Sequence, residues 1–209
     1  MPSLLVLHGY TMNAGTMREH MAPLHARLAT RASVVYATAP FDCSTASVER
    51  FYGGSSLQRV PGPYLTWWDA SDDGREYRGW ETTRDGLHAL IREHAPAGVL
   101  GFSQGAIVTA ALVATAPPEI AALLRFALMI AGRVPRAIAL EPYFVQPVRV
   151  PSLHVWGDRD GMAAVSPELV GHFDESTREV ARWAGGHRVP VDGAAADAIV
   201  SFVGRDWGA

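Results

Sequence analysis

The chain has 209 residues, of which 48% are hydrophobic and 19% are charged, and these values are typical of one globular domain. The formal net charge of −3 excludes the strongly basic surface that nucleic-acid binding requires, so we expect no nucleic-acid partner. No stretch approaches the roughly 20 consecutive apolar residues of a transmembrane helix, so we expect no membrane insertion.

Six short runs rich in Val, Leu and Ile recur along the chain, and turns and helical patterns separate them. They predict strands over 3–9, 33–40, 97–103, 126–132, 152–158 and 177–186. Near-continuous apolar strands that alternate with helices predict a mostly parallel sheet with helices on both faces. The expected fold class is therefore α/β.

Three helices are predicted, two of them between these strands and one after the last strand. They cover 17–30, 104–116 and 192–207, and the second of them is apolar enough to be buried. Pro23 lies inside the first pattern and should kink or restart that helix. The apolar face of the first helix consists of Met17, Met21, Leu24 and Leu28.

Two segments lack a clear period. Residues 41–79 are rich in Gly, Pro, Ser and aromatic residues, and residues 135–151 contain four prolines. A connection as long as 41–79 inside a compact domain is usually a binding loop or a lid. We therefore expect a single domain over 1–209 that carries an irregular, lid-like insertion at about 41–79.

Polar residues gather where the predicted strands end, which is where open parallel sheets place their ligand sites. His8 ends the first strand, Ser103 ends the third, and His187 follows the last. Asp158 and Asp160 lie at the end of the fifth strand. The chain order Ser, Asp, His is that of the nucleophile, acid and base in α/β-hydrolases.

Ser103 lies in the sequence Gly-Phe-Ser-Gln-Gly, between a predicted strand and a predicted helix. Gly101 and Gly105 would permit the sharp turn that presents a nucleophilic serine. Such a short motif, taken alone, is equally compatible with a serine that caps the helix. The strand before it, the helix after it and the downstream Asp and His favour a nucleophile.

The other catalytic groups follow from the same logic. His187, in a glycine-rich loop, is the expected base, and a carboxylate must accept a hydrogen bond from its Nδ1. Asp160, beyond the tight turn, is favoured for that carboxylate, with Asp158 as the alternative. The oxyanion donors are expected to be the backbone N–H groups of Gln104 and Tyr10.

Four segments together resemble a known family. "LHGY", "GFSQGA", "SLHVWGDRDGM" and "GGHRVP" are similar to the FSH-type (OVCA2-like) serine hydrolase family of the α/β-hydrolase superfamily. "YLTWW" and "EYRGWETTRDGL" add to this resemblance, which covers about residues 3–203. It implies an α/β-hydrolase fold and an esterase or thioesterase whose triad is Ser103, Asp160 and His187. It also supports Tyr10 and Gln104 as oxyanion donors.

The expected reaction is hydrolysis of a small-molecule acyl ester or thioester through an acyl-enzyme, and it calls for no metal and no organic cofactor. An acyltransferase, or a non-catalytic binding protein with an α/β-hydrolase-like fold, is the alternative. Four aromatic residues of the insertion either line an apolar acyl channel or pack as its core. These residues are Trp67, Trp68, Tyr64 and Phe51.

The remaining features concern the environment of the protein. Cys43 is the one cysteine, so no internal disulfide can form. No basic leader precedes the first apolar run, and the expected location is the cytoplasm. The sequence leaves the oligomeric state open.

Overall fold

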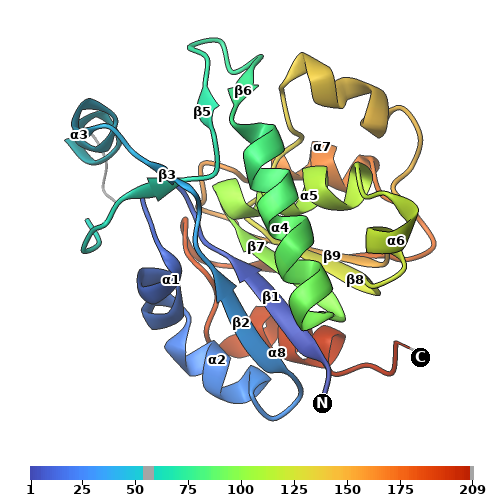
Figure 1. The fold of residues 1–209 in the computed structure, drawn as a ribbon. Coiled ribbons are helices and arrows are strands. Elements are labelled where there is room, and N and C mark those ends of the chain that lie inside the picture. Colours follow the sequence, from blue (N-terminus) through green and yellow to red (C-terminus); the bar gives the residue numbers. More distant parts are fainter. Residues whose placement is uncertain (54–58, 208–209) are drawn as a thin grey trace.

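One six-stranded sheet forms the centre of the computed structural model, which describes residues 1–53 and 59–207 (Figure 1). Its strand order is β10-β9-β8-β7-β1-β2, and every pair of neighbours is parallel. The six predicted strands are confirmed. They are β1 (Ser3–Leu7), β2 (Ser33–Ala37), β7 (Gly98–Phe102), β8 (Phe126–Ile130), β9 (Ser152–Gly157) and β10 (Arg178–Trp183).

Helices cover both faces of this sheet, as the apolar strands predict. One layer contains α1 (Ala14–His20), α2 (Ala22–Leu28) and α8 (Gly193–Val203). The other contains α4 (Trp80–His94), α5 (Gln104–Ala114) and the short α6 (Pro118–Ala121). The short helix α7 (Ser166–Gly171) and the 3₁₀ helix η1 (Ile138–Phe144) lie beside α5, in the second layer.

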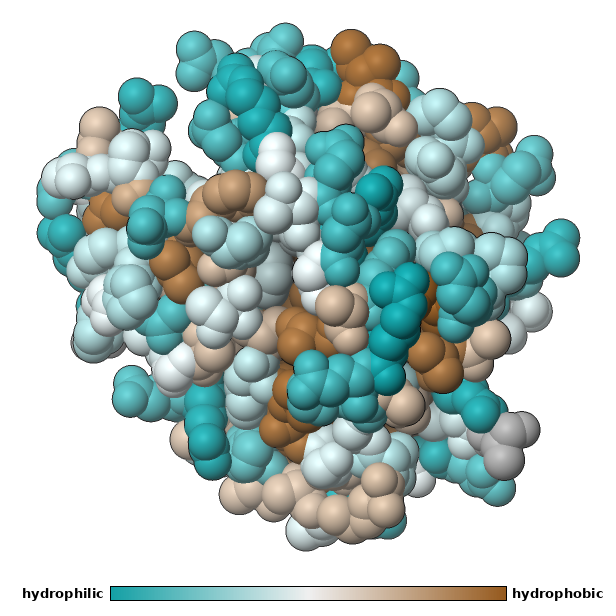
Figure 2. All heavy atoms as spheres, in the orientation of Figure 1, coloured by the Kyte–Doolittle hydropathy of each residue, from teal (hydrophilic) through white to brown (hydrophobic). Residues whose placement is uncertain are grey.

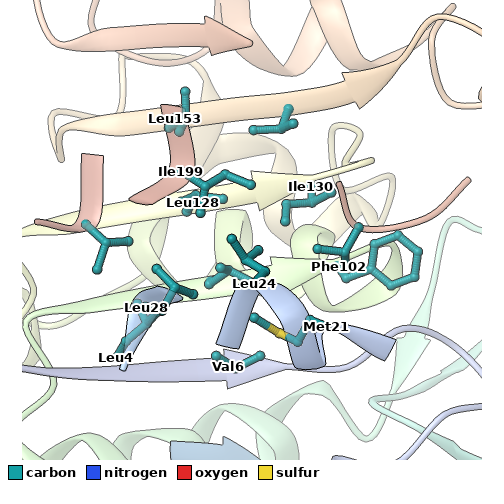
Figure 3. Close-up of a cluster of buried hydrophobic side chains, with 14 of the residues drawn as sticks. Leu4, Val6, Met21, Leu24, Leu28, Phe102, Leu128, Ile130, Leu153 and Ile199 are labelled. Carbon is teal, nitrogen blue, oxygen red and sulfur yellow. The ribbon is translucent and has the colours of Figure 1, made fainter. Parts of the chain in front are cut away.

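The first predicted helix is divided at Met21, as Pro23 suggested. Met21 ends α1, and Pro23 lies in the first turn of α2, where its missing N–H costs no helical hydrogen bond. The four residues of the predicted apolar face are all fully buried. Figure 3 shows Met21, Leu24 and Leu28 packed over the sheet residues of this layer.

The insertion at 41–79 contains more regular structure than its composition indicates. Strand β3 (Phe41–Asp42) pairs antiparallel with β4 (Leu65–Thr66), and β5 (Asp69–Ala70) pairs antiparallel with β6 (Tyr77–Arg78). Helix α3 (Thr45–Gly53) follows β3. Residues 54–58 of the predicted insertion, like 208–209 of the predicted domain, lie outside the described residues.

One face of the molecule, seen in the orientation of Figure 1, is mainly polar. In the view of Figure 2, hydrophilic residues cover most of the visible face, and hydrophobic residues appear there in separate patches. Across 1–53 and 59–207, none of the helices has the length and apolar character that crossing a bilayer would take.

Candidate active site

Ser103 occupies the sharp turn between β7 and α5. Its backbone has φ 55° and ψ −116°, a combination that a residue with a side chain adopts only under strain. The backbone N–H of Ser103 donates a 2.8 Å hydrogen bond to the carbonyl oxygen of Ile130, at the end of the neighbouring strand β8. The turn is thereby fixed to the sheet, and its side chain lies at the carboxyl edge.

The two glycines of the motif are required by close backbone approach. A Cβ on Gly101 would lie 2.1 Å from the carbonyl oxygen of Gly105. A Cβ on Gly105 would lie 2.4 Å from the carbonyl oxygen of Leu7 in β1. Both contacts are with backbone, which cannot move aside, so helix α5 can approach the sheet this closely only with glycine at both positions.

The structure brings the three predicted catalytic side chains into one hydrogen-bonded chain. His187 Nε2 lies 2.9 Å from Ser103 Oγ, and His187 Nδ1 lies 2.8 Å from Asp160 Oδ1. Asp160 is almost completely buried, and its Oδ1 also accepts a hydrogen bond from the backbone N–H of Met162. If His187 carries its proton on Nδ1, its Nε2 is free to accept the hydroxyl proton of Ser103. This is the geometry of general-base activation of a serine.

Asp158, the alternative acid, has a different partner. Its carboxylate forms an ion pair with Arg182, with an N–O distance of 2.6 Å, and it is exposed to solvent. Asp160 is therefore the carboxylate that contacts the His187 imidazole in this structure.

The loop after β1 supplies the second predicted oxyanion donor, Tyr10, and it is braced by His8. The Nδ1 of His8 donates to the carbonyl oxygen of Gly9 at 2.8 Å, and its Nε2 accepts from the backbone N–H of Ala39 at 3.0 Å. Burial lowers the pKa of His8 to about 4, which keeps the ring neutral and suits this pattern of one donor and one acceptor. Within the described residues, the backbone N–H groups of Tyr10 and Gln104 donate no hydrogen bond. Both are therefore free to donate one to a ligand atom.

The depressed pKa values of buried histidines predict a loss of stability in acid. Burial lowers the pKa of His8 to about 4 and that of His154, in β9, to about 3, whereas both titrate near 6.5 when unfolded. Their neutral forms stabilise the fold above pH 6.5, and this contribution is lost as the pH falls toward 4. We expect each to lower the free energy of unfolding by about 2 kcal/mol between pH 7 and pH 5. Urea unfolding at both pH values measures this loss, and equal stability at the two would contradict it. The variant His94→Gln, which changes an exposed histidine, should leave the loss unaltered.

The side chain of Gln104 connects the nucleophile turn to the insertion. Its Oε1 accepts a 3.2 Å hydrogen bond from the backbone N–H of Trp67, and its Nε2 donates to Thr66 Oγ1 at 2.9 Å. The sequence assigned a role only to the Gln104 backbone. No local pattern could indicate the side-chain role, because the partners are 37 and 38 residues away.

A cavity of about 790 Å³ opens beside Ser103 and His187. Of the four aromatic residues predicted for an acyl channel, Phe51 lines this cavity, and the other three lie outside its lining. Trp67 is fully buried, and its indole N–H donates to the carbonyl oxygen of His8 at 2.8 Å. Trp68 is also buried and stacks on Tyr77.

Tyr64 does not line the same cavity, and its hydroxyl accepts a 3.0 Å hydrogen bond from the Nε of Arg59, which does. Trp67 thus lies in the core beneath the insertion, whereas Trp68, although buried, lines a second cavity that is described below.

His20, to which the sequence assigned no function, forms part of the cavity wall. It stacks on Phe102, which in turn contacts the His187 ring. Burial and the neighbouring His187 and Arg188 lower the pKa of His20. No sequence signal distinguishes it from the other histidines of helical patterns, because its place depends on how α1 packs against β7.

Comparison with known proteins identifies the family of this chain. The family model described as "Serine hydrolase (FSH1)" matches residues 1–199. "Esterase OVCA2" of Xenopus tropicalis is 32% identical over 202 residues, which cover 90% of this chain and 85% of that protein. "Family of serine hydrolases 2" of Saccharomyces cerevisiae is 30% identical over 209 residues, with 90% and 91% coverage.

Solved structures share the architecture. SOBER1 of Arabidopsis thaliana superposes with a TM-score of 0.65 at 19% identity, over 97% of each chain. Esterase PE8 superposes with a TM-score of 0.66 at 20% identity, over 97% of this chain and 91% of its own. At these identities the likeness shows the fold alone, and it confirms the predicted α/β-hydrolase fold.

Proposed function

Because the chain belongs to the serine hydrolase (FSH1) family, we propose that it cleaves carboxylic esters or thioesters of small molecules. The observation that supports this proposal most directly is the hydrogen-bonded chain from Ser103 through His187 to Asp160. Ser103 is the proposed nucleophile, His187 the general base, and Asp160 the carboxylate that orients the imidazole.

The first half of the reaction forms an acyl-enzyme. His187 Nε2 takes the Ser103 hydroxyl proton while Oγ attacks the acyl carbonyl carbon. The negative charge that develops on the carbonyl oxygen is stabilised by the backbone N–H groups of Tyr10 and Gln104. The imidazolium then protonates the leaving alcohol or thiol, which departs. Asp160 stabilises the imidazolium throughout this half.

Water completes the reaction. His187 removes a proton from a water molecule, and the resulting hydroxide attacks the acyl carbon of the ester on Ser103. The same two N–H groups stabilise the second oxyanion, and Ser103 leaves with the proton that His187 returns. The products are a carboxylic acid and the free enzyme. The cavity beside Ser103, with Phe51 in its wall, offers space for one of the substrate's two parts.

Covalent labelling tests this proposal. A fluorophosphonate probe reacts only with a serine that its own site activates, so we expect one probe per chain, attached to Ser103 and identified by peptide mass spectrometry. Absence of labelling, with the fold verified by circular dichroism, would favour the non-catalytic binding protein. Product analysis with an added alcohol or amine separates hydrolysis from transfer, since a transferase would convert the acceptor to an ester or amide.

A further inference from the structure

A second cavity lies on the other side of the Tyr10 loop. It measures about 900 Å³ and is lined by the insertion, by the beginning of α5 and by the loop that follows β8. Tyr10 lines both this cavity and the one beside Ser103, and Gln104 lines the second. The second cavity therefore adjoins both residues whose N–H groups are the proposed oxyanion donors. A substrate whose carbonyl group lies at those donors can reach into the second cavity with one of its two parts.

Arg133 is the unusual residue of this second cavity, which we call the Arg133 cavity. It comes three positions after Ile130, the residue whose carbonyl oxygen anchors the Ser103 N–H. Its Nε is buried and has no hydrogen-bond partner. Within the described residues, no hydrogen bond or ion pair involves its side chain.

Arg133 is half-buried, and a guanidinium whose buried Nε has no partner is costly. Arginine stays charged at any ordinary pH, so it cannot escape the cost by losing a proton. Leaving such a donor unsatisfied costs more than leaving a neutral one, and the groups that satisfy it best are carboxylates and phosphates. The position of Arg133 in a cavity that adjoins the active site indicates that a bound ligand supplies the missing partner.

The other charged groups of the Arg133 cavity do not neutralise Arg133. Asp69 is paired with Arg78 at 2.7 Å, and both side chains are exposed. The cavity wall also carries Asp42 and Asp72 and, with opposite charge, Arg50 and Arg136, and all four are exposed. The cavity wall thus carries four arginines and three aspartates. The one residue of these seven that is partly buried is Arg133, which is positively charged.

We propose that the Arg133 cavity binds a carboxylate carried by the substrate, which makes the preferred substrates anionic esters or thioesters. This inference rests on the proposed hydrolase function. The guanidinium of Arg133 pairs with the carboxylate in a fork of two hydrogen bonds, while the reacting carbonyl lies between Ser103 and the Tyr10 loop. The carboxylate belongs either to the acyl chain or to the leaving group, and the experiment below distinguishes the two sources.

Three thioesters, assayed by release of free thiol, separate these sources. The neutral reference is the hexanoyl thioester of N-acetylcysteamine. The acyl-side test compound is the adipic half-thioester of the same thiol, and the leaving-group test compound is the hexanoyl thioester of 3-mercaptopropionate. We expect one of the two anionic compounds to exceed the reference in kcat/KM by at least about tenfold. A change of this size corresponds to the free energy that one charge-assisted hydrogen-bonded pair contributes.

Variants assign this preference to Arg133. Arg133→Met should reduce the ratio of anionic to neutral kcat/KM by at least about tenfold, and Arg133→Lys, which keeps the charge but loses the fork, by less. Arg92→Met removes an exposed charge on α4 and should leave the ratio unchanged. If wild type prefers neither anionic compound, or if Arg133→Met keeps the wild-type ratio, the proposal is wrong.

A binding measurement keeps this inference separate from the hydrolase proposal. Calorimetry with the Ser103→Ala variant compares the anionic compound with the neutral reference, and no reaction is needed. The proposal is supported if Ser103→Ala binds the anionic compound more tightly than the neutral one and if this difference disappears in Ser103→Ala/Arg133→Met. This result supports the Arg133 cavity even if wild type hydrolyses nothing. Hydrolysis without any dependence on Arg133 overturns the Arg133 cavity and leaves the hydrolase proposal standing.

Discussion

Replacing Ser103 with alanine is expected to lower kcat for p-nitrophenyl butyrate by about a millionfold, the loss typical of a missing triad nucleophile. The variant lacks the oxygen that forms the acyl-enzyme, while the Tyr10 and Gln104 amides stay in place. Some acceleration over the reaction in water should therefore persist, because oxyanion stabilisation alone retains about a thousandfold. Steady-state kinetics with purified protein measures the loss.

The matched control for this variant is Ser201→Ala, which makes the same chemical change at an exposed position on α8. It should retain wild-type kcat and KM. Ser103→Ala should unfold at a temperature close to that of wild type, since the one hydrogen bond of Oγ among the described residues is that with His187. A Ser103→Ala protein that is folded and turns over at the wild-type rate would refute the nucleophile assignment.

Replacing Asp160 with asparagine is expected to lower kcat by about ten-thousandfold at neutral pH. The amide of asparagine can donate a hydrogen bond to Nδ1, which holds the imidazole in the tautomer whose Nε2 carries the proton. That Nε2 cannot accept the Ser103 proton. The loss of the carboxylate also removes the charge that stabilises the imidazolium. The pH dependence of kcat/KM for p-nitrophenyl butyrate, measured with both proteins, quantifies the effect.

Asp158→Asn is the natural comparison, because the sequence alone leaves both aspartates open as the acid. Asp158 is exposed and paired with Arg182, and exposed pairs contribute little, so this variant should stay within about twofold of wild type. If Asp158→Asn were the inactive variant and Asp160→Asn the active one, the proposed role of Asp160 would be wrong.

Local patterns were sufficient to predict the main architecture. The strands could be recognised because burial on both faces of a parallel sheet demands uninterrupted apolar runs, as in Leu4–Leu7, where every residue is buried. Pro23 marked the boundary between α1 and α2 because its ring is compatible with a first helical turn and not with a helix interior.

That Ser103, Asp160 and His187 would lie close together was expected from their order along the chain and from the rule that parallel strands present their carboxyl ends at one edge. What the sequence could not supply depends on contacts between distant segments. Helix α3 packs Phe51 against Tyr10, β3 pairs with β4, and β5 pairs with β6. These contacts join segments that have no clear period of their own. Trp67 is an example, because the same sequence is compatible with a tryptophan that lines a channel and with one that is buried in the core. Only the folded structure shows that Trp67 is buried and that its indole N–H donates to the carbonyl oxygen of His8.

The Arg133 cavity was beyond prediction for a similar reason. Arg133 directly follows the predicted strand 126–132, and an arginine in such a loop usually points to solvent. Only the three-dimensional placement of its neighbours buries its Nε without a hydrogen-bond partner among the described residues.

The backbone of Ser103 bears on how this protein can change under selection. Its φ of 55° suits glycine better than any residue with a side chain, so heat resistance alone would favour glycine at this position. A screen of random variants for survival at high temperature would therefore enrich proteins that lack the proposed nucleophile. Under the proposed function, selection would retain serine at this position only while the reaction contributes to fitness. A descendant released from that demand could drift to glycine and become a more robust, inert protein.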